Sequence, residues 1–325
     1  MKILGITIGD PNGIGPEVVV KAIFSLKGSK KFIPVIIGNK SVITKAQQIS
    51  KTPFKIRCVD NIDVYHKDWE SIQLIHINKP DKIIKGIATK ESGFASVQYI
   101  KKAIELAKTG IIHGIVTAPI CKEAINKSGF HWEGHTEMLA ELTMSSNYAM
   151  VFKGGPLMII LATIHKPLKA VPNLITKQVL IKVIKLAKKT CDMFRIKEPK
   201  IAVAGLNPHA GENGLFGDEE INIIKPAILT CRHEGINVSG PYPPDTVFHM
   251  AYKRKFDIVV CMYHDQGLIP LKMIAFDKGV NITVGLPFIR TSPDHGTAYD
   301  IAWKGIANPS SMIEAIKTAS RLIIK

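Results

Sequence analysis

The sequence predicts an α/β protein with a largely parallel central β-sheet. Short runs of apolar and β-branched residues, such as residues 32–38 (FIPVIIG), alternate along the chain with amphipathic segments of helical period, such as residues 175–194. This alternation is typical of strands and helices that follow one another around a parallel sheet. The chain has 325 residues, of which 46% are hydrophobic and 22% charged, so we expect a sizeable core divided between two domains or lobes.

The N-terminal part predicts a strand, a glycine-rich turn and a helix. Residues 3–8 form a short apolar run, residues 9–17 (GDPNGIGPE) form a loop, and Pro16 lies where the first turn of a helix tolerates proline. The turn can present backbone N–H groups to an anion, or it can be a tight strand–helix connection without a ligand. It does not match the dinucleotide fingerprint GxGxxG. The apolar run is too short for a signal peptide, and no run reaches the roughly 18 residues that span a bilayer, so we expect a soluble cytoplasmic protein.

Further along the chain, strands and helices are predicted in alternation. An amphipathic helix covers residues 91–110 and ends at a glycine, and a strand, a turn and a helix follow within residues 112–126. The remaining predicted elements are a helix that opens near Gly134, two strands in residues 148–172 with the second ending at His165, a helix over 175–194, a strand and loop over 200–214, helices near 218–234, and a strand closed by His264. Residues 39–90 show no clear pattern.

The charge and the cysteines exclude some classes of function. The net charge is +16, but only six of the 43 basic residues are arginines, and the lysines are scattered along helical faces, so we do not expect a nucleic-acid-binding protein. The five cysteines are widely spaced, odd in number and form no CxxC pair. Neither a disulfide framework nor a thiolate zinc site is therefore predicted.

Three histidines follow apolar runs at predicted strand ends. These are His165, His209 and His264. Because the carboxyl ends of parallel strands meet at one crevice, the three imidazoles are a candidate ligand set for a divalent metal with an open position for substrate. Taken singly, each histidine is more typical of a structural role than of a metal ligand. Asp265 is placed to orient an imidazole, and Asp245 is a candidate for a further ligand or a general base.

A second group of polar residues predicts an anion site. Lys272, Asn281 and Arg290 recur at intervals of nine in a segment that is otherwise apolar, where a cation is costly without an anionic partner. The alternative for each is a surface position. The pair His135–Thr136 follows Gly134 at a helix start, where it can bind phosphate, although the spacing alone favours Thr136 as an ordinary N-cap.

Several motifs together resemble the 4-hydroxythreonine-4-phosphate dehydrogenases of pyridoxal-phosphate biosynthesis. They are GDPNGIGPE, GHTE, the THKP-like segment 163–167, GLNPHAGE (205–212), MYHDQGLIPLK (262–272), GVNITVGLPFIRTSPDHGTA (279–298) and KGIANP (304–309). The likeness runs in order from residue 3 to the C-terminus and is weakest over residues 39–90. The last motif also resembles the cofactor loop of isocitrate and isopropylmalate dehydrogenases, which have a two-lobed fold.

This resemblance implies an isocitrate/isopropylmalate dehydrogenase-like fold with residues 1–130 and 270–325 in a cofactor-side lobe, residues 131–269 in a metal and dimerisation lobe, and the active site in the cleft between them. It implies a homodimer in which the metal is shared between chains. The implied metal ligands are His165, His209 and His264, and the implied substrate contacts are His135, Thr136, Lys272, Asn281 and Arg290. The implied cofactor contacts are His295, Gly296, Thr297, Asp300 and Asn308.

The implied reaction uses NAD or NADP and one divalent metal (zinc, magnesium or cobalt). It oxidises 4-phosphooxy-L-threonine, a phosphorylated hydroxy amino acid, to 2-amino-3-oxo-4-phosphooxybutanoate, which loses carbon dioxide to give 3-amino-2-oxopropyl phosphate. Asp245 and Lys272 are the two candidates for the group that takes the hydroxyl proton. A sibling enzyme acting on 4-phosphothreonate or 4-phosphoerythronate is the nearest alternative, and a metallohydrolase is a more distant one.

Overall fold

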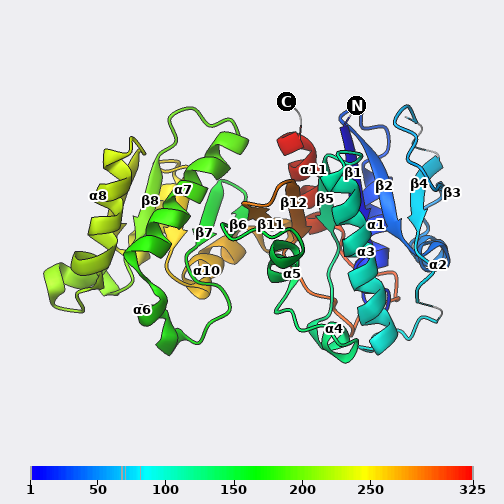
Figure 1. Cartoon of the computed structure of the whole chain (residues 1–325), viewed down its shortest axis with the longest axis horizontal. Helices are drawn as coiled ribbons and strands as arrows, with labels where there is room; N and C mark the ends of the chain where they lie inside the picture. Colours follow the sequence, from blue (N-terminus) through cyan, green and yellow to red (C-terminus); the bar gives the residue numbers. More distant parts are fainter. Residues whose placement is uncertain (1, 67–68, 70, 81, 324–325) are drawn as a thin grey trace. The chain divides into compact units, whose positions relative to one another are not determined.

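The chain folds into two compact units. The structure is a computed structural model that describes residues 2–66, 69, 71–80 and 82–323 (Figure 1). One unit is built from residues 1–146 and 286–325, and the other from residues 147–285. The α/β class with mostly parallel strands, predicted from the sequence, is confirmed. Among the residues that the structure describes, every helix is too short or too polar to cross a bilayer.

The first unit contains a parallel sheet in the order β3, β4, β2, β1, β5, β12. The bounds are Lys2–Thr7 for β1, Phe32–Gly38 for β2, Lys55–Cys58 for β3, Ser71–His76 for β4, Gly114–Thr117 for β5 and Ile289–Pro293 for β12. All seven residues of β2 are buried, as are all four of β5. These strands have helices on both faces, so their side chains are apolar on both sides and the sequence runs are continuous.

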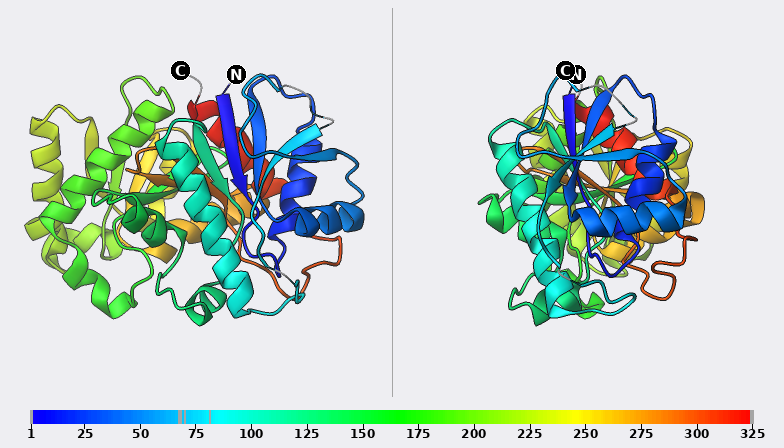
Figure 2. Two further views of the ribbon diagram at one scale, coloured as in Figure 1. Left: turned by 45° about the vertical axis from the view of Figure 1, so that its right-hand side comes forward. Right: turned by 90° about the vertical axis from the view of Figure 1, so that its right-hand side faces the viewer.

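The helices of the first unit form two layers. Their bounds are Gly15–Ser25 for α1, Lys40–Ser50 for α2, Lys90–Lys108 for α3, Lys122–Lys127 for α4, His135–Leu142 for α5 and Ser310–Ile323 for α11. Figure 2 shows α3 on one face of the sheet and α1 with α11 on the other. α3 begins at a capping box in which Thr89 and Ser92 bond each other's backbone, which is why the helix starts where it does.

The second unit contains a mixed sheet in the order β11, β6, β7, β10, β8, β9. β6 is antiparallel to β11 and β7, and the other pairs are parallel. The strands span Ala149–Gly154 (β6), Leu157–Leu161 (β7), Ile201–Ala204 (β8), Val238–Tyr242 (β9), Ile258–Cys261 (β10) and Val280–Val284 (β11). The helical segments span Leu168–Ala170 (η1), Val171–Leu174 (α6), Lys177–Met193 (α7), Pro208–Gly214 (η2), Glu220–Ile224 (η3), Lys225–His233 (α8), Pro244–Tyr252 (α9), His264–Ala275 (α10) and Phe276–Lys278 (η4).

The core of the second unit lies between its sheet and the helices α9 and α10. Alternate residues of β7 and β10, including Ile159 and Val259, pack against Val247 of α9 and Leu271 of α10. The intervening strand residues, such as Ile160, are also fully buried, because α7 contacts β7, β8 and β10. Both faces are thus covered, and polar side chains are left to the strand ends.

Two of the predicted strands end earlier than expected. β7 ends at Leu161 and not at His165, because the chain leaves the sheet after Thr163, whose backbone N–H donates to the Met262 carbonyl. β10 ends at Cys261, and His264 is the first residue of α10 and not the last residue of a strand. Both histidines therefore lie on connections just beyond strand ends, where side chains are not fixed by the sheet.

Candidate functional site

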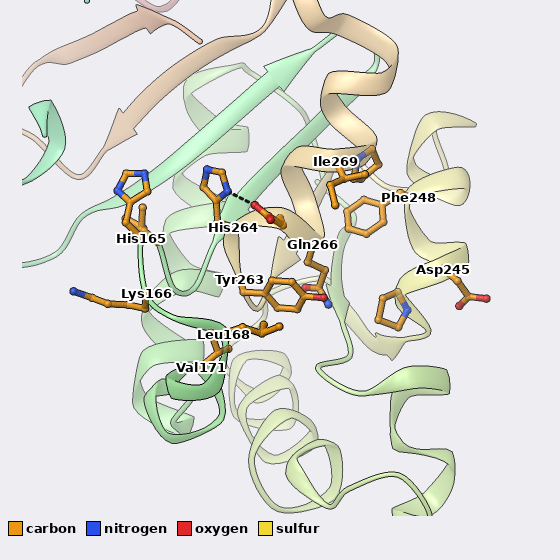
Figure 3. Close-up of a pocket in the computed structure, with 14 residues that line it drawn as sticks. His165, Lys166, Leu168, Val171, Asp245, Phe248, Tyr263, His264, Gln266 and Ile269 are labelled. Atoms are coloured by element: carbon orange, nitrogen blue, oxygen red, sulfur yellow. Dashed lines mark hydrogen bonds and ion pairs between the residues drawn. The ribbon is translucent and has the colours of Figure 1, made fainter. Parts of the chain in front are cut away.

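A pocket of about 700 Å³ opens in the second unit (Figure 3). It is formed by the connection after β7, the first part of α9 and the first two turns of α10. Its lining residues are Ile164, His165, Lys166, Leu168, Val171, Pro244, Asp245, Phe248, Tyr263, His264, Asp265, Gln266, Ile269 and Pro270. Two predicted metal ligands and one predicted general base therefore share one pocket.

His165 and His264 lie next to each other at one end of this pocket. Their ring centroids are 5.6 Å apart. Two imidazoles on one tetrahedral ion, each at about 2.1 Å from it, have ring centres about 5 Å apart, so the pair fits a divalent metal. The Asp265 carboxylate lies 2.7 Å from Nδ1 of His264 (Figure 3). This contact orients the ring and leaves Nε2 available for a ligand, which is the arrangement expected of a metal-binding histidine.

His209 does not join this pair within one chain. It lies in η2, where its ring packs beside Phe216 and its Nδ1 is 3.3 Å from a carboxylate oxygen of Glu212. Over the described ranges, no three His, Cys, Asp or Glu side chains of the chain are grouped so that they could hold an ion. The structure thus brings two of the three predicted ligands together.

The predicted proton acceptors are placed differently. Asp245 is exposed and lies at the opposite end of the pocket from His165 and His264 (Figure 3). Lys272 is partly buried on α10, with its Nζ 5.9 Å from the ring centroid of Phe276. The geometry therefore separates Asp245 from the imidazole pair.

Asn281 lies on β11, opposite Phe152 of β6. Its side-chain oxygen is buried, and within the described part of the chain it has no hydrogen-bond partner. A buried polar atom without a partner is costly, so a ligand group that donates a hydrogen bond would stabilise this position.

In the first unit, α5 begins at His135. Gly134 is the N-cap and no side chain caps the helix, so the interpretation of Thr136 as an ordinary N-cap is wrong. Thr136 instead lies in the first turn and is 3% exposed. The start of α5 therefore has no side-chain cap, as expected where a helix start faces a ligand.

Arg290 is almost completely buried beside this helix start. It lies on β12, is 1% exposed, and its Nη2 donates to Thr117 Oγ1 at 2.8 Å. Burial lowers the pKa of Arg290 to about 9 while the nearby Glu137 charge raises it, so the guanidinium stays a cation at pH 7. Burial and the nearby Arg290 charge lower the pKa of His135 well below its usual value, so His135 is neutral. Its Nε2 is buried and has no hydrogen-bond partner among the residues described. A buried cation beside an unsatisfied imidazole is suited to an anion.

The predicted cofactor loop, residues 295–308, packs on the glycine-rich turn after β1. Ile14 donates its backbone N–H to the Thr297 carbonyl at 3.0 Å, and the Tyr299 hydroxyl donates to the buried Asp10 carboxylate at 2.8 Å. Burial raises the pKa of Asp10. A side chain at Gly13 would meet the Thr297 backbone oxygen at 2.9 Å, which explains the glycine there.

The same contacts bear on the two interpretations of the glycine-rich turn. The backbone N–H groups of Asp10, Asn12, Gly13 and Ile14 all donate to acceptors within the protein. These four groups are therefore occupied, which favours a strand–helix connection that supports the loop.

Glu17 and Lys21 hold the far end of the loop, and neither residue stands out in the sequence. Glu17 is 2% exposed and accepts from the backbone N–H of Ala307 at 2.8 Å and of Gly305 at 3.3 Å. Lys21 pairs with Glu17 at 2.8 Å and donates to the carbonyls of the same two residues at 2.8 Å. An acidic residue in the first turn of a helix is common, so its position alone did not point to this contact.

The fold is that of the isocitrate dehydrogenase-like class of α/β proteins. The structure of isocitrate dehydrogenase from Methylococcus capsulatus matches with a TM-score of 0.50 over 98% of this chain and 85% of that chain, at 15% identity. Within this class, the chain belongs to the PdxA family: the family model described as pyridoxal phosphate biosynthetic protein PdxA matches residues 30–319. This confirms the resemblance and makes the chain an oxidoreductase.

Relatives with two different names are similarly close. The 4-hydroxythreonine-4-phosphate dehydrogenase of Desulforapulum autotrophicum is 44% identical over 98% of this chain and 94% of its own length. The D-threonate 4-phosphate dehydrogenase of Salmonella typhimurium is 44% identical over 99% of both chains. The solved structure of 4-hydroxythreonine-4-phosphate dehydrogenase from Klebsiella pneumoniae matches with a TM-score of 0.91 at 40% identity, over 100% of both chains. Identity alone does not choose between the two substrates.

Proposed function

We propose that the chain oxidises 4-phosphooxy-L-threonine with NAD or NADP and a divalent metal. The product, 2-amino-3-oxo-4-phosphooxybutanoate, is a β-keto acid that loses carbon dioxide to give 3-amino-2-oxopropyl phosphate. Membership of the PdxA family supports this proposal. The observation that carries it is the buried cation of Arg290 beside the neutral His135, because this pair is suited to a phosphate group.

For substrate binding we propose the five residues predicted from the sequence. Arg290, His135 and Thr136 would hold the phosphate, the first through charge-assisted hydrogen bonds and the others through an imidazole and a helix start. Lys272 and Asn281 would contribute to the grip on phosphate and carboxylate, the first as a cation and the second through its side-chain N–H groups. The buried Asn281 side-chain oxygen would accept from a donor group of the substrate. These contacts would hold the reacting carbon in one position against the nicotinamide.

The metal site is assigned to His165, His209 and His264. The imidazole pair in the pocket fits a divalent ion of the zinc, magnesium or cobalt type, with at least one ligand from a second copy of the chain in a homodimer. When bound, such an ion lowers the pKa of the substrate hydroxyl and stabilises the enolate left by decarboxylation. Asp265 would keep the His264 ring in the orientation that presents Nε2.

Two residues are candidates for the general base. Asp245 lines the same pocket as the imidazoles but lies at its other end, and Lys272 lies on α10. Asp245→Asn and Lys272→Met remove one candidate each with little change of shape. The variant that loses the acid limb of the kcat/KM profile identifies the base, because that limb reports protonation of the group that must accept the proton.

The cofactor is assigned to the loop that carries His295, Gly296, Thr297, Asp300 and Asn308. Its anchorage on the glycine-rich turn and on Glu17 supports a fixed binding surface for the adenosine side of NAD or NADP. The cytoplasmic location and the division of the active site between the predicted lobes stay predictions from the sequence.

The function is tested with the purified chain, a divalent metal and either nicotinamide cofactor. We expect NAD(P)H formation and release of carbon dioxide with 4-phosphooxy-L-threonine, and loss of both on addition of a chelator. Equal or greater turnover of 4-phosphothreonate would instead make the chain a threonate 4-phosphate dehydrogenase. The relative from Salmonella typhimurium, named D-threonate 4-phosphate dehydrogenase, supports this alternative. Phosphate release without nicotinamide reduction would instead indicate a metallohydrolase. His209→Ala should lose both bound metal and activity while the fold is retained.

A further inference from the structure

The three chain segments that carry the histidines are linked by buried polar side chains. These are Thr163, Gln266 and Glu220, which are 6%, 7% and 1% exposed. None of them is a predicted ligand or substrate contact. Buried polar groups are costly unless hydrogen-bonded, so the bonds that they make determine how the backbone is arranged around them.

Gln266 connects the segment of His264 to the segment of His209. Its side-chain oxygen accepts from the backbone N–H of Met262, just after β10, at 2.7 Å. Its side-chain nitrogen donates to the carbonyl of Gly205, just after β8, at 2.7 Å. Because one end of the side chain accepts and the other donates, only an amide makes both bonds. A carboxylate would face the Gly205 carbonyl without a proton.

Glu220 holds the segment that leads to His209. One carboxylate oxygen accepts from the backbone N–H groups of Leu206 at 2.7 Å and Asn207 at 2.8 Å. The other accepts from the Asn207 side chain at 2.9 Å. The carboxylate therefore fixes the two residues that stand just before Pro208 and His209.

The turn that carries His209 needs such support. Five consecutive residues, 209–213, have positive φ angles of 53°, 54°, 81°, 42° and 54°, and only one of them is glycine. Each non-glycine residue in this region costs roughly 1–2 kcal/mol, so local preference does not hold the turn. The bonds of Glu220 and Gln266 fix residues 205–207, from which this turn starts, and so restrict where the turn can lie.

Thr163 completes the connection at the segment of His165. Thr163 lies two residues before His165, and its hydroxyl donates to the Met262 carbonyl at 2.7 Å. A continuous path of hydrogen bonds therefore runs from Thr163 through Met262 and Gln266 to Gly205, and Glu220 binds the two residues that follow. All three histidine segments lie on this path.

We propose that Gln266 and Glu220 are positioning residues that hold the metal-binding histidine segments in register. The proposal rests on the proposed metal site and its homodimer. His209 does not meet His165 and His264 within one chain, so register between the three segments matters only if His209 serves the metal site of a second copy. Ligand orientation governs metal affinity, and the loss of a supporting contact typically weakens binding about 10- to 100-fold. A merely structural role would lower stability and leave the affinity of the folded protein unchanged.

The test is the affinity of the metal-free full chain for Zn²⁺, measured by competition with a chromophoric chelator. The variants are Gln266→Met, which retains the side-chain volume but makes neither bond, and Glu220→Gln, which turns a donor toward the Asn207 amide. The matched control is Thr190→Val, because Thr190 is also fully buried in the second unit and its hydroxyl donates to the Leu186 carbonyl within α7. The visible spectrum of bound Co²⁺ reports ligand geometry independently.

We expect Zn²⁺ to bind at least tenfold more weakly to Gln266→Met and Glu220→Gln, with an altered Co²⁺ spectrum, whereas Thr190→Val binds as the wild type does. Wild-type affinity in both variants, with melting temperatures lowered as in Thr190→Val, would overturn the proposal. His264→Ala separates failure of the metal site from failure of the positioning role. If His264→Ala loses Zn²⁺ while Gln266→Met does not, the metal site stands and the positioning role fails. If His264→Ala binds as well as the wild type, the proposed metal site itself fails. Should Gln266→Met not fold, Glu220→Gln decides.

Discussion

Replacement of Arg290 by methionine tests the proposed phosphate grip. Methionine has a similar length, so Arg290→Met removes the charge from a position that is 1% exposed without opening a large cavity. A hydrogen bond to a charged group contributes about 1.5–3 kcal/mol, and every 1.4 kcal/mol is a factor of ten. We therefore expect kcat/KM for the phosphorylated substrate to fall about 10- to 150-fold. The upper end is favoured because the site is buried and because the neutral His135 does not replace the lost charge.

The structure also defines what the substitution does to the fold. Thr117 loses the donor that lies 2.8 Å from its hydroxyl, which costs about 1 kcal/mol of the free energy of unfolding. Such a loss leaves the protein folded at assay temperature.

The assay is steady-state kinetics with substrate and cofactor varied in turn. We expect the substrate KM to rise much more than the cofactor KM, since Arg290 lies on β12 and not in the loop of residues 295–308. Arg321→Met, at an exposed position on α11, is the control and should behave as the wild type does. A substrate KM within twofold of the wild-type value, or an equal rise in both KM values, would refute the assignment of Arg290 to the phosphate.

Three further predictions follow from burial and contacts. Burial lowers the pKa of His135, so the folded chain binds fewer protons than the unfolded chain below pH 6.5. The free energy of unfolding should therefore fall on acidification below that pH, by up to about 1.4 kcal/mol per pH unit. Urea unfolding at pH 7.5 and 5.5 should show a smaller loss in His135→Gln than in the wild type or in His131→Gln at an exposed position, and an equal loss in all three would contradict this. Glu17→Gln should raise the cofactor KM about tenfold and leave the substrate KM unchanged, because it weakens the contacts with the backbone of residues 305 and 307. Glu105→Gln, at an exposed position, is the control. Equal changes in the two KM values would argue against a role confined to the loop. Burial raises the pKa of Cys191 to about 12, whereas Cys58 is exposed. An aromatic disulfide at pH 8 should therefore modify Cys58 in the native chain and Cys191 only after unfolding. Modification of the native Cys58→Ser variant at the wild-type rate would contradict this.

Long apolar runs made the main elements predictable. The predicted strand over residues 32–38 coincides with β2, and the predicted helix over 91–110 differs from α3 by one or two residues at each end. The segment 39–90 was not predictable, although it contains α2, β3 and β4. β3 is a four-residue edge strand with three exposed residues, so it lacks the apolar pattern of a buried strand.

The candidate site was predictable where a residue type was unusual for its surroundings. Arg290 stood among apolar residues, and it is buried at the helix start that carries His135 and Thr136. Gln266 and Glu220 were missed because all but one of their partners are backbone groups, which every residue possesses and which therefore leave no mark in the sequence. The signal that was available was a polar residue at a buried helical position, and this becomes informative only when burial is known.

The division of the chain into a continuous and an interrupted unit has a consequence for biosynthesis. Residues 147–285 are contiguous, so the second unit can complete its sheet as soon as it leaves the ribosome. The sheet of the first unit is completed later, because β5 lacks its neighbour until β12 has been synthesised. Glu17 likewise contacts Ala307 only after another 290 residues have been added. Contacts of such long sequence separation form slowly. A nascent chain that stops near residue 285 would carry an open strand edge at β5, and open strand edges favour association between incomplete chains.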